Sequence, residues 1–135
     1  MNATCPCGKK RRLDECCGRF LSGAAEAKTA EQLMRSRYSA YALGGYGEYL
    51  LRTWFPATVG ELSAPELDQK TLDWQRLEIL NKSQHGDRAT VEFKAWYQAP
   101  DAAEPSAMHE VSEFTRVRGR WYYVGGRVGG AGEES

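Results

Sequence analysis

All four cysteines of the chain lie within its first seventeen residues, as Cys5, Cys7, Cys16 and Cys17. They form a C-x-C-x8-C-C pattern, so four sulfur ligands fall within thirteen residues. Four thiolates at this spacing are enough to close one tetrahedral zinc site, and such a site folds a peptide that has no core of its own. The spacing therefore predicts a knuckle built around one structural Zn²⁺.

Two other uses of the cysteines stay open at this point. Disulfides need an oxidising compartment, but residues 1–4 do not resemble a signal peptide and no apolar run is long enough to span a membrane. Two disulfides within so short a loop would also be strained. A redox or catalytic thiol usually has a base such as His beside it, and the first histidine along the chain is His85. We therefore favour zinc and a cytoplasmic location.

The N-terminal segment resembles the SEC-C motif, through Cys5-Pro6-Cys7-Gly8, the basic run after it and Cys16-Cys17-Gly18. This motif is a small zinc-binding tail on the bacterial secretion ATPase and on many otherwise unrelated proteins. The resemblance places the four cysteines on the four ligand positions, the last being Cys where some members have His. The second glycine of the usual Gly-Ser-Gly-Lys-Lys-Tyr stretch is missing here, which should change the loop more than the ligation.

The remainder of the chain resembles the YchJ family of bacterial proteins. The resemblance is carried by AEQLMRSRYSAY (residues 30–41), Tyr49-Leu50, Thr53-Trp54, the HExSxF segment (109–114) and GRWYYVGG (119–126). It covers nearly the whole chain and implies a SEC-C motif followed by a nuclear-transport-factor-two-like domain. This domain is an α+β cone in which helices pack on a curved antiparallel sheet. Many members carry a second SEC-C motif at the C-terminus, which this chain lacks, and the resemblance implies a fold rather than an activity.

The periodicity of the sequence predicts the same class of fold. Thr29 and Gln32 form a capping box for a helix that ends at Gly44-Gly45. Shorter helices are expected at 46–54, closed by Pro56, and at 65–72, where Ser63 is the cap. The period then changes to two, which predicts strands at 74–82, 88–98, 108–117 and 120–124. Helices followed by a four-stranded antiparallel meander give an α+β layer packing.

These elements divide the chain into four parts. We expect a zinc knuckle at 1–19, a linker at 20–28, the cone at 29–128 and a flexible tail at 129–135. The linker is inferred from its small residues, such as Ser22-Gly23-Ala24-Ala25, and it is expected to be mobile enough to decouple the knuckle from the cone. On the strand at 88–98 the alternating apolar residues share one face, and Trp96, Phe114 and Trp121 are expected in the core.

A curved sheet covered by helices leaves a pocket at its wide end, where some folds bind ligands. The expected lining is Arg37, Tyr38, Tyr41, Trp54, Trp96, His109 and Glu113. An inward Arg37 would need a carboxylate partner, for which Glu92, Glu110 or Glu113 could serve. His109 with its neighbouring glutamates is the best acid–base set, but no nucleophile–base pair is visible. We therefore expect a polar network that braces the cone, and catalytic residues stay unassigned.

The charges of the chain bear on its partners. Lys+Arg and Asp+Glu are both 18, which argues against a dedicated nucleic-acid coat or a polybasic membrane binder. The knuckle loop nevertheless carries four cations, Lys9, Lys10, Arg11 and Arg12. Such a loop is expected to dock on an acidic protein surface, or on nucleic acid, including the RNA of the ribosome. The alternative is a staple that only tidies the N-terminus, and the mobile linker favours docking.

These observations predict a cytoplasmic, zinc-containing binding or adaptor protein rather than an enzyme. No membrane partner is expected. The alternatives are a small-molecule enzyme, isomerase- or dehydratase-like, and a ligand sensor, both using the cone pocket for an unknown ligand.

Overall fold

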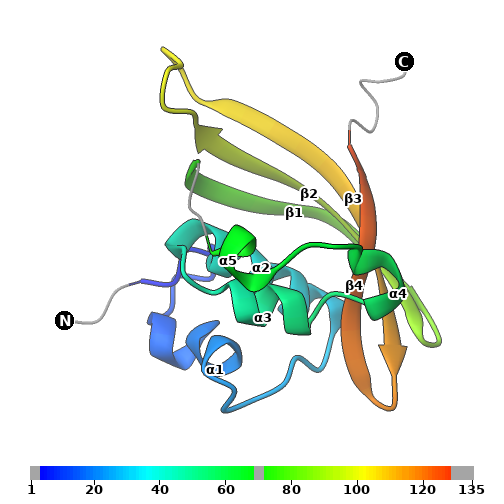
Figure 1. The fold of residues 1–135 in the computed structure, drawn as a ribbon. Helices are drawn as coiled ribbons and strands as arrows, with labels where there is room; N and C mark the ends of the chain where they lie inside the picture. Colours follow the sequence, from blue (N-terminus) through cyan, green and yellow to red (C-terminus); the bar gives the residue numbers. More distant parts are fainter. Residues whose placement is uncertain (1–3, 69–71, 129–135) are drawn as a thin grey trace.

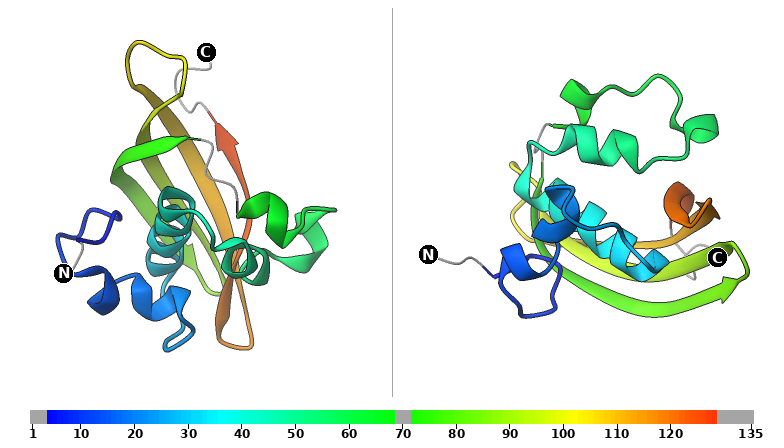
Figure 2. Two further views of the ribbon diagram at one scale, coloured as in Figure 1. Left: turned by 60° about the vertical axis from the view of Figure 1, so that its left-hand side comes forward. Right: turned by 90° about the horizontal axis from the view of Figure 1, so that it is seen from below.

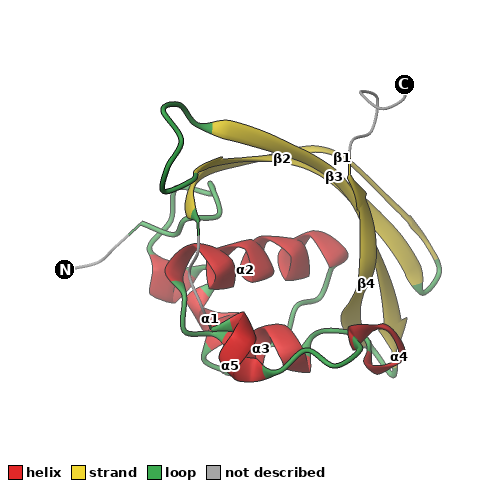
Figure 3. Ribbon diagram, turned by 45° about the horizontal axis from the view of Figure 1, so that its top comes forward, coloured by secondary structure: helices red, strands yellow, loops and turns green. Residues whose placement is uncertain are grey.

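The computed structural model describes residues 4–68 and 72–128, and it shows one antiparallel sheet of four strands in the order β1-β2-β3-β4 (Figure 1). The strands are β1 (Asp73–His85), β2 (Arg88–Gln98), β3 (Ser106–Val117) and β4 (Arg120–Val128). The sheet arches over the helices, which lie on its concave side (Figure 3). The predicted α+β cone is therefore confirmed, while the tail predicted at 129–135 lies outside the described residues.

The main helix, α2 (Ala30–Leu43), lies beneath the arch of the sheet. Its start is fixed by Thr29, whose Oγ1 accepts a hydrogen bond of 3.1 Å from the backbone N–H of Gln32. The Gln32 side chain in turn accepts from the N–H of Lys28 at 2.7 Å, one residue earlier than in the expected capping box. The helix ends at Gly44, whose φ of 76° is a left-handed value that favours glycine.

The remaining helices are short. They are the single 3₁₀ turn η1 (Leu13–Glu15), α1 (Gly18–Leu21), α3 (Gly47–Arg52), α4 (Pro56–Val59) and α5 (Ala64–Leu67). Pro56 does not close the second helix but begins α4, because a proline fits the first helical turn, where its N–H would have no partner. The cap expected at Ser63 is present, with Glu66 accepting a hydrogen bond from the Ser63 N–H at 3.0 Å.

The core lies between α2 and the concave face of the sheet. The alternating residues of β2 from Ala89 to Ala95 are all buried, as are Phe114 and Trp121. Trp96 is only half-buried, and its ring lies under the guanidinium of Arg76, with 4.5 Å from the guanidinium carbon to the ring centroid. Neighbouring residues of a strand point to opposite faces, so Trp96 lies on the outer face of the sheet and not in the core.

The segment expected to be a linker, at 20–28, packs against the cone instead. Helix α1 buries Phe20 and Leu21 in the main core, and the Nε1 of Trp121 donates to the carbonyl of Lys28 at 3.3 Å. The small residues after α1 form an exposed turn, but the apolar pair before that turn anchors it. Among the described residues, no helix has the length and apolar character needed to cross a membrane.

Candidate metal centre and cone pocket

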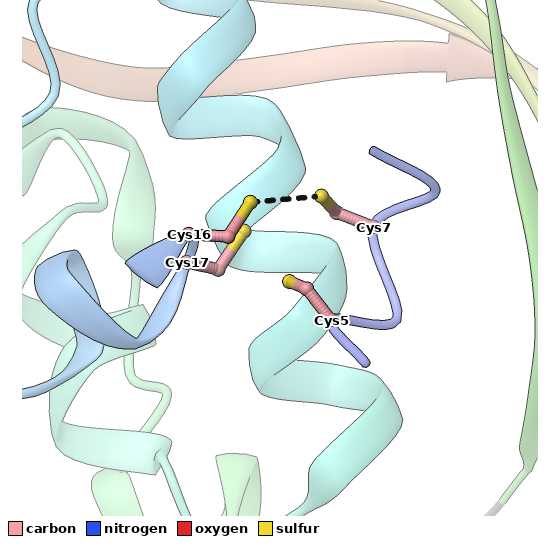
Figure 4. A group of neighbouring side chains, drawn as sticks. All are labelled: Cys5, Cys7, Cys16 and Cys17. Atoms are coloured by element: carbon pink, nitrogen blue, oxygen red, sulfur yellow. Dashed lines mark hydrogen bonds between the residues drawn. The ribbon is translucent and has the colours of Figure 1, made fainter. Parts of the chain in front are cut away.

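The four cysteines converge on one point (Figure 4). Cys5 and Cys7 come from the loop before η1, and Cys16 and Cys17 come from the junction between η1 and α1. All four are free thiols and buried. Their Sγ atoms all lie within 4.8 Å of one another, and those of Cys7 and Cys16 are 3.6 Å apart. The fold thus brings together two pairs of cysteines that are nine or more residues apart in sequence.

Local backbone geometry makes this convergence achievable. The N–H of Cys5 donates to the carbonyl of Arg11 at 2.8 Å, which closes the loop between the two cysteine pairs. Gly8 reverses the chain at a φ of 94°, which glycine adopts without strain. A Cβ on Gly18 would lie 2.6 Å from the carbonyl oxygen of Leu13, so only glycine fits there. The backbone geometry therefore explains why glycine stands at positions 8 and 18, beside the two cysteine pairs.

The cluster fits a metal ion. Tetrahedral ligation with Zn–S bonds of about 2.3 Å places sulfur atoms ~3.8 Å apart, close to the separation of Cys7 and Cys16. Hydrogen bonds with Cys17 and Cys7 lower the pKa of the Cys5 thiol, whereas hydrogen bonds with Cys5 and Cys7, together with burial, raise the pKa of Cys17. A bound dication would allow all four crowded sulfurs to be thiolates.

The cluster is held against helix α2, and Figure 2 shows the N-terminal loop beside it. The Nη1 of Arg35 donates to the carbonyl of Cys7 at 2.6 Å, and the Sγ of Cys5 lies 3.5 Å from the Oγ of Ser39. A methyl group built on Gly8 would lie 3.4 Å from the carbonyl oxygen of Leu77 in β1. The knuckle therefore contacts both layers of the cone and is not a separate, loosely tethered unit.

The basic residues of the knuckle loop are exposed, as expected, but they are not equivalent. Arg12 pairs with Asp14 at 2.8 Å and with Glu15 at 3.6 Å. Within residues 4–68 and 72–126, none of the ion pairs involves Lys9, Lys10 or Arg11. Three cations of the loop are thus free of carboxylate partners in the described part of the chain.

A pocket of about 220 Å³ lies between α2, Trp54 and the concave face of the sheet; we call it the cone pocket. It is lined by Met34, Arg37, Tyr38, Tyr41, Trp54, Trp74, Phe93, Ala95, Met108, Glu110, Ser112, Phe114 and Tyr123. Four residues expected at the pocket, Arg37, Tyr38, Tyr41 and Trp54, are among them. The pocket is chiefly apolar, with a cation from the helix layer and a carboxylate from the sheet.

Three other residues expected at the pocket lie elsewhere, which corrects that expectation. His109 hydrogen bonds to Glu92 at 2.6 Å, on the face of β3 opposite to the cone pocket. Glu113 lines a second hollow together with His85 and Arg88. Trp96 packs under Arg76 on the outer face. The physical reason is strand parity, because Met108, Glu110 and Ser112 take the inward positions and the odd-numbered residues between them point outward.

The sheet contributes the carboxylate of Glu110 to the pocket, a residue expected only as one of three possible partners of Arg37 and not as part of the lining. It accepts hydrogen bonds from the Oγ of Ser112 at 2.8 Å and from the hydroxyl of Tyr123 at 3.4 Å. Gly126 on β4 leaves room for it, because a Cβ there would collide with the Glu110 carboxylate. Pairing Glu110 with inward-facing Phe93 across the sheet would have predicted this position.

Comparisons with known proteins agree on the family. A family model described as "YchJ, middle NTF2-like domain" matches residues 29–126. A UPF0225 protein of Bordetella parapertussis is 45% identical to the chain over 93% of each sequence.

Two solved structures of SEC-C motif containing proteins resemble the fold. The one from Rhodopseudomonas palustris has a TM-score of 0.81 and 35% identity, covering 94% of this chain and 98% of that one. The one from Psychrobacter arcticus has a TM-score of 0.78 and 31% identity, covering 93% of this chain and 82% of that one. With most of its length matched by the NTF2-like family model and its cysteines matching a SEC-C motif, the chain belongs to the YchJ family.

Proposed function

We propose that the four cysteines hold one structural Zn²⁺, and that the loop fixed by this zinc docks on an acidic surface of another protein. The donor set supports the zinc, because four sulfur ligands fill a tetrahedral site and leave no position for a substrate or an activated water. Zinc in such a site supplies folding energy rather than chemistry. Thiolate ligation also fits a reducing compartment, which supports a cytoplasmic location.

One observation carries the docking proposal: Lys9, Lys10 and Arg11 are exposed and have no ion pair within the described residues, on a loop with candidate metal ligands at both ends. A loop held in one conformation loses little freedom when it binds. Four thiolates and one Zn²⁺ leave a net charge of minus two beneath the loop, which weakens attraction for a polyanion such as RNA. We therefore favour an acidic protein surface, contacted by a rigid loop rather than by a mobile tether.

Metal analysis tests the first half of this proposal. The purified protein should contain about one zinc per chain, and Cys16→Ser should lose it. Iron must be measured alongside, because four sulfur ligands also suit iron. Protein that is made with zinc available and contains neither metal would refute the site.

Removal of the loop's three unpaired cations tests the second half of the proposal. The triple change Lys9→Ser, Lys10→Ser and Arg11→Ser should keep zinc content and melting temperature, because exposed charges contribute little to stability. Binding to a poly-glutamate peptide should be lost, and the parent protein should release this peptide as salt rises. The matched control removes three exposed cations elsewhere, Arg88, Lys94 and Arg118, and should bind like the parent. Equal binding by both variants would refute docking, and preferential binding of poly(U) RNA would change the partner class.

The cone pocket supports a second candidate, a ligand-binding role. The pocket contains few side chains that could act as a general acid or base, since His109 and Glu92 pair on the opposite face of the sheet. Glu110 is the pocket's carboxylate among the described residues, the Ser112 hydroxyl donates to it at 2.8 Å, and the lining includes no histidine that could move a proton. Ligand binding is therefore better supported than catalysis.

A further inference from the structure

Arg37 presents a buried positive charge to the cone pocket without an opposite charge beside it. The residue is 5% exposed, and its Nη1 donates to the carbonyl of Leu50 at 2.8 Å and to the Oγ1 of Thr53 at 2.7 Å. Both acceptors are neutral. None of the ion pairs among the described residues involves Arg37. Burying a cation is costly unless a counter-charge offsets the lost hydration.

Aromatic rings supply part of that compensation. The guanidinium carbon of Arg37 lies 5.0 Å from the ring centroid of Trp54 and 4.5 Å from that of Tyr123. Desolvation lowers the pKa of Arg37 from its usual value, in keeping with a cation that has lost water. Cation–π contacts offset less of this lost hydration than a buried ionic partner would. The guanidinium thus remains available to an anion.

Two further donors at the pocket have no partner. The hydroxyl of Tyr38 and the indole Nε1 of Trp54 are buried and make no hydrogen bond among the described residues. Buried polar groups nearly always have a partner, so two such groups in one pocket lining need an explanation. An indole N–H is a donor and never an acceptor. Among the described residues, the Trp54 Nε1 therefore lacks an acceptor, and Arg37 lacks a counter-charge.

The negative charge in the pocket, the Glu110 carboxylate, already has hydrogen-bond donors from the protein. Glu110 already accepts hydrogen bonds from Ser112 and Tyr123, and none of the ion pairs among the described residues joins it to Arg37. The rest of the lining is apolar, with Met34, Phe93, Met108 and Phe114 prominent. The pocket therefore offers one cation, Arg37, beside the ring of Trp54 and an apolar surface.

We propose that the cone pocket binds a small organic carboxylate, whose anionic end pairs with Arg37 and whose aromatic or branched aliphatic body fills the apolar part. The planar guanidinium matches a carboxylate through parallel hydrogen bonds. A volume of about 220 Å³ is smaller than the ~300–1,000 Å³ typical of drug-sized sites, which indicates a metabolite-sized ligand. This site is independent of the zinc and of the docking loop.

A purely structural role for Arg37 makes a different prediction. Through Leu50 and Thr53 the residue ties α2 to the end of α3, and through Tyr123 it contacts β4. A brace of this kind would give the pocket no preference for an acid over its uncharged analogue. Discrimination between a carboxylate and the matching amide therefore separates the two roles.

The test uses the zinc-loaded full chain and the four tryptophan indole N–H signals in NMR spectra. Benzoate and phenylacetate are titrated, with benzamide, phenylacetamide and phenethylamine as neutral and cationic matches. We expect the Trp54 signal to shift with the acids at about millimolar affinity and at least about tenfold more weakly with the amides. Arg37→Gln should abolish this preference, and Trp54→Phe, which keeps a stacking ring but removes the N–H, should weaken acid binding severalfold.

His109→Gln on the outer face is the control and should bind the acids like the parent. The wild-type titration alone decides the proposal if Arg37→Gln does not fold. No shift of the Trp54 signal up to about 10 mM of either acid would overturn it, since binding weaker than this carries no useful free energy. Equal binding of acid and amide would overturn it in favour of the brace, and stronger binding of phenethylamine would identify Glu110 as the group that selects the ligand.

Discussion

Glu31 joins three parts of the molecule at a single carboxylate. It accepts hydrogen bonds from Arg35, which also holds the knuckle, and from Lys82 on β1, at 2.8 and 2.6 Å. Burial raises the pKa of Glu31, but the hydrogen bonds from Lys82 and Arg35 outweigh it and lower the pKa to about 2. A carboxyl whose pKa is lower in the folded state stabilises that state above its unfolded pKa of about 4.5.

Glu31→Gln should therefore matter at neutral pH and not in acid. We expect the variant to lose on the order of 1 kcal/mol at pH 7, a discounted figure because Lys82 is largely exposed. The difference from the parent should shrink as the pH falls from about 5 to 2, since both proteins are then uncharged at this position. Urea unfolding at several pH values measures this, with the exposed Glu48→Gln as control. A difference that stays constant across this range would contradict the assignment.

Single-residue contacts were the least predictable level. Residue type alone predicts a carboxylate partner for an inward Arg37, but its partners are a carbonyl, a hydroxyl and two aromatic rings. The residue type indicated that the charge of a buried Arg37 must be offset by neighbouring groups. Tyr123 lies far from it in sequence, so local spacing could not show which groups compensate it.

At the scale of the elements, strand β4 is anchored by Trp121. The side chain is 2% exposed, and Arg116 stacks on its ring at 5.0 Å. Trp121→Ala should cost about 3–5 kcal/mol, a large part of the stability of a small domain. Trp96→Ala is the matched control, because that ring is half-buried on the outer face, and it should lose much less. Chemical denaturation measures both, and similar losses would show that burial does not separate the two strand faces.

The elements themselves were well predicted, and the errors have identifiable causes. Capping at Thr29 and the period of the helix placed α2, and alternation placed all four strands. Alternation alone does not say which face of β3 is inward, which is why His109 and Glu113 were assigned to the pocket and Glu110 was not. The register, with Phe93 opposite Glu110, settles that choice. A register shift between Glu113 and Phe114 adds an irregularity that no periodic pattern contains.

At the scale of the whole molecule, the knuckle and the cone form one packed unit. The sequence suggested separation, because small residues follow α1 and look like a linker. The contacts that join the parts are long-range, such as Arg35 to Cys7 and Cys5 to Ser39. The small residues of a short segment indicate a flexible backbone, but they do not show that the neighbouring Phe20 and Leu21 are buried in the core. The cysteine pattern thus predicted the ligands but not their attachment.

This attachment predicts how metal removal affects the whole fold. Chelation, or Cys16→Ser, should release the knuckle and with it about two hydrogen bonds to α2, or of order 2 kcal/mol. In a domain of this size ~2 kcal/mol corresponds to a fall in melting temperature of about 5–10 °C, within one cooperative transition. Calorimetry measures this, with zinc restored to the chelated protein as the control. An unchanged melting temperature, or a separate low-temperature transition for the knuckle, would show that the two parts are decoupled. Arg35→Ala in zinc-loaded protein locates the coupling when it is compared with Glu31→Gln, because both variants disturb the Arg35–Glu31 pair but only Arg35→Ala removes the bond to the Cys7 carbonyl, while all four sulfur ligands remain. It should keep its zinc and still melt below the parent.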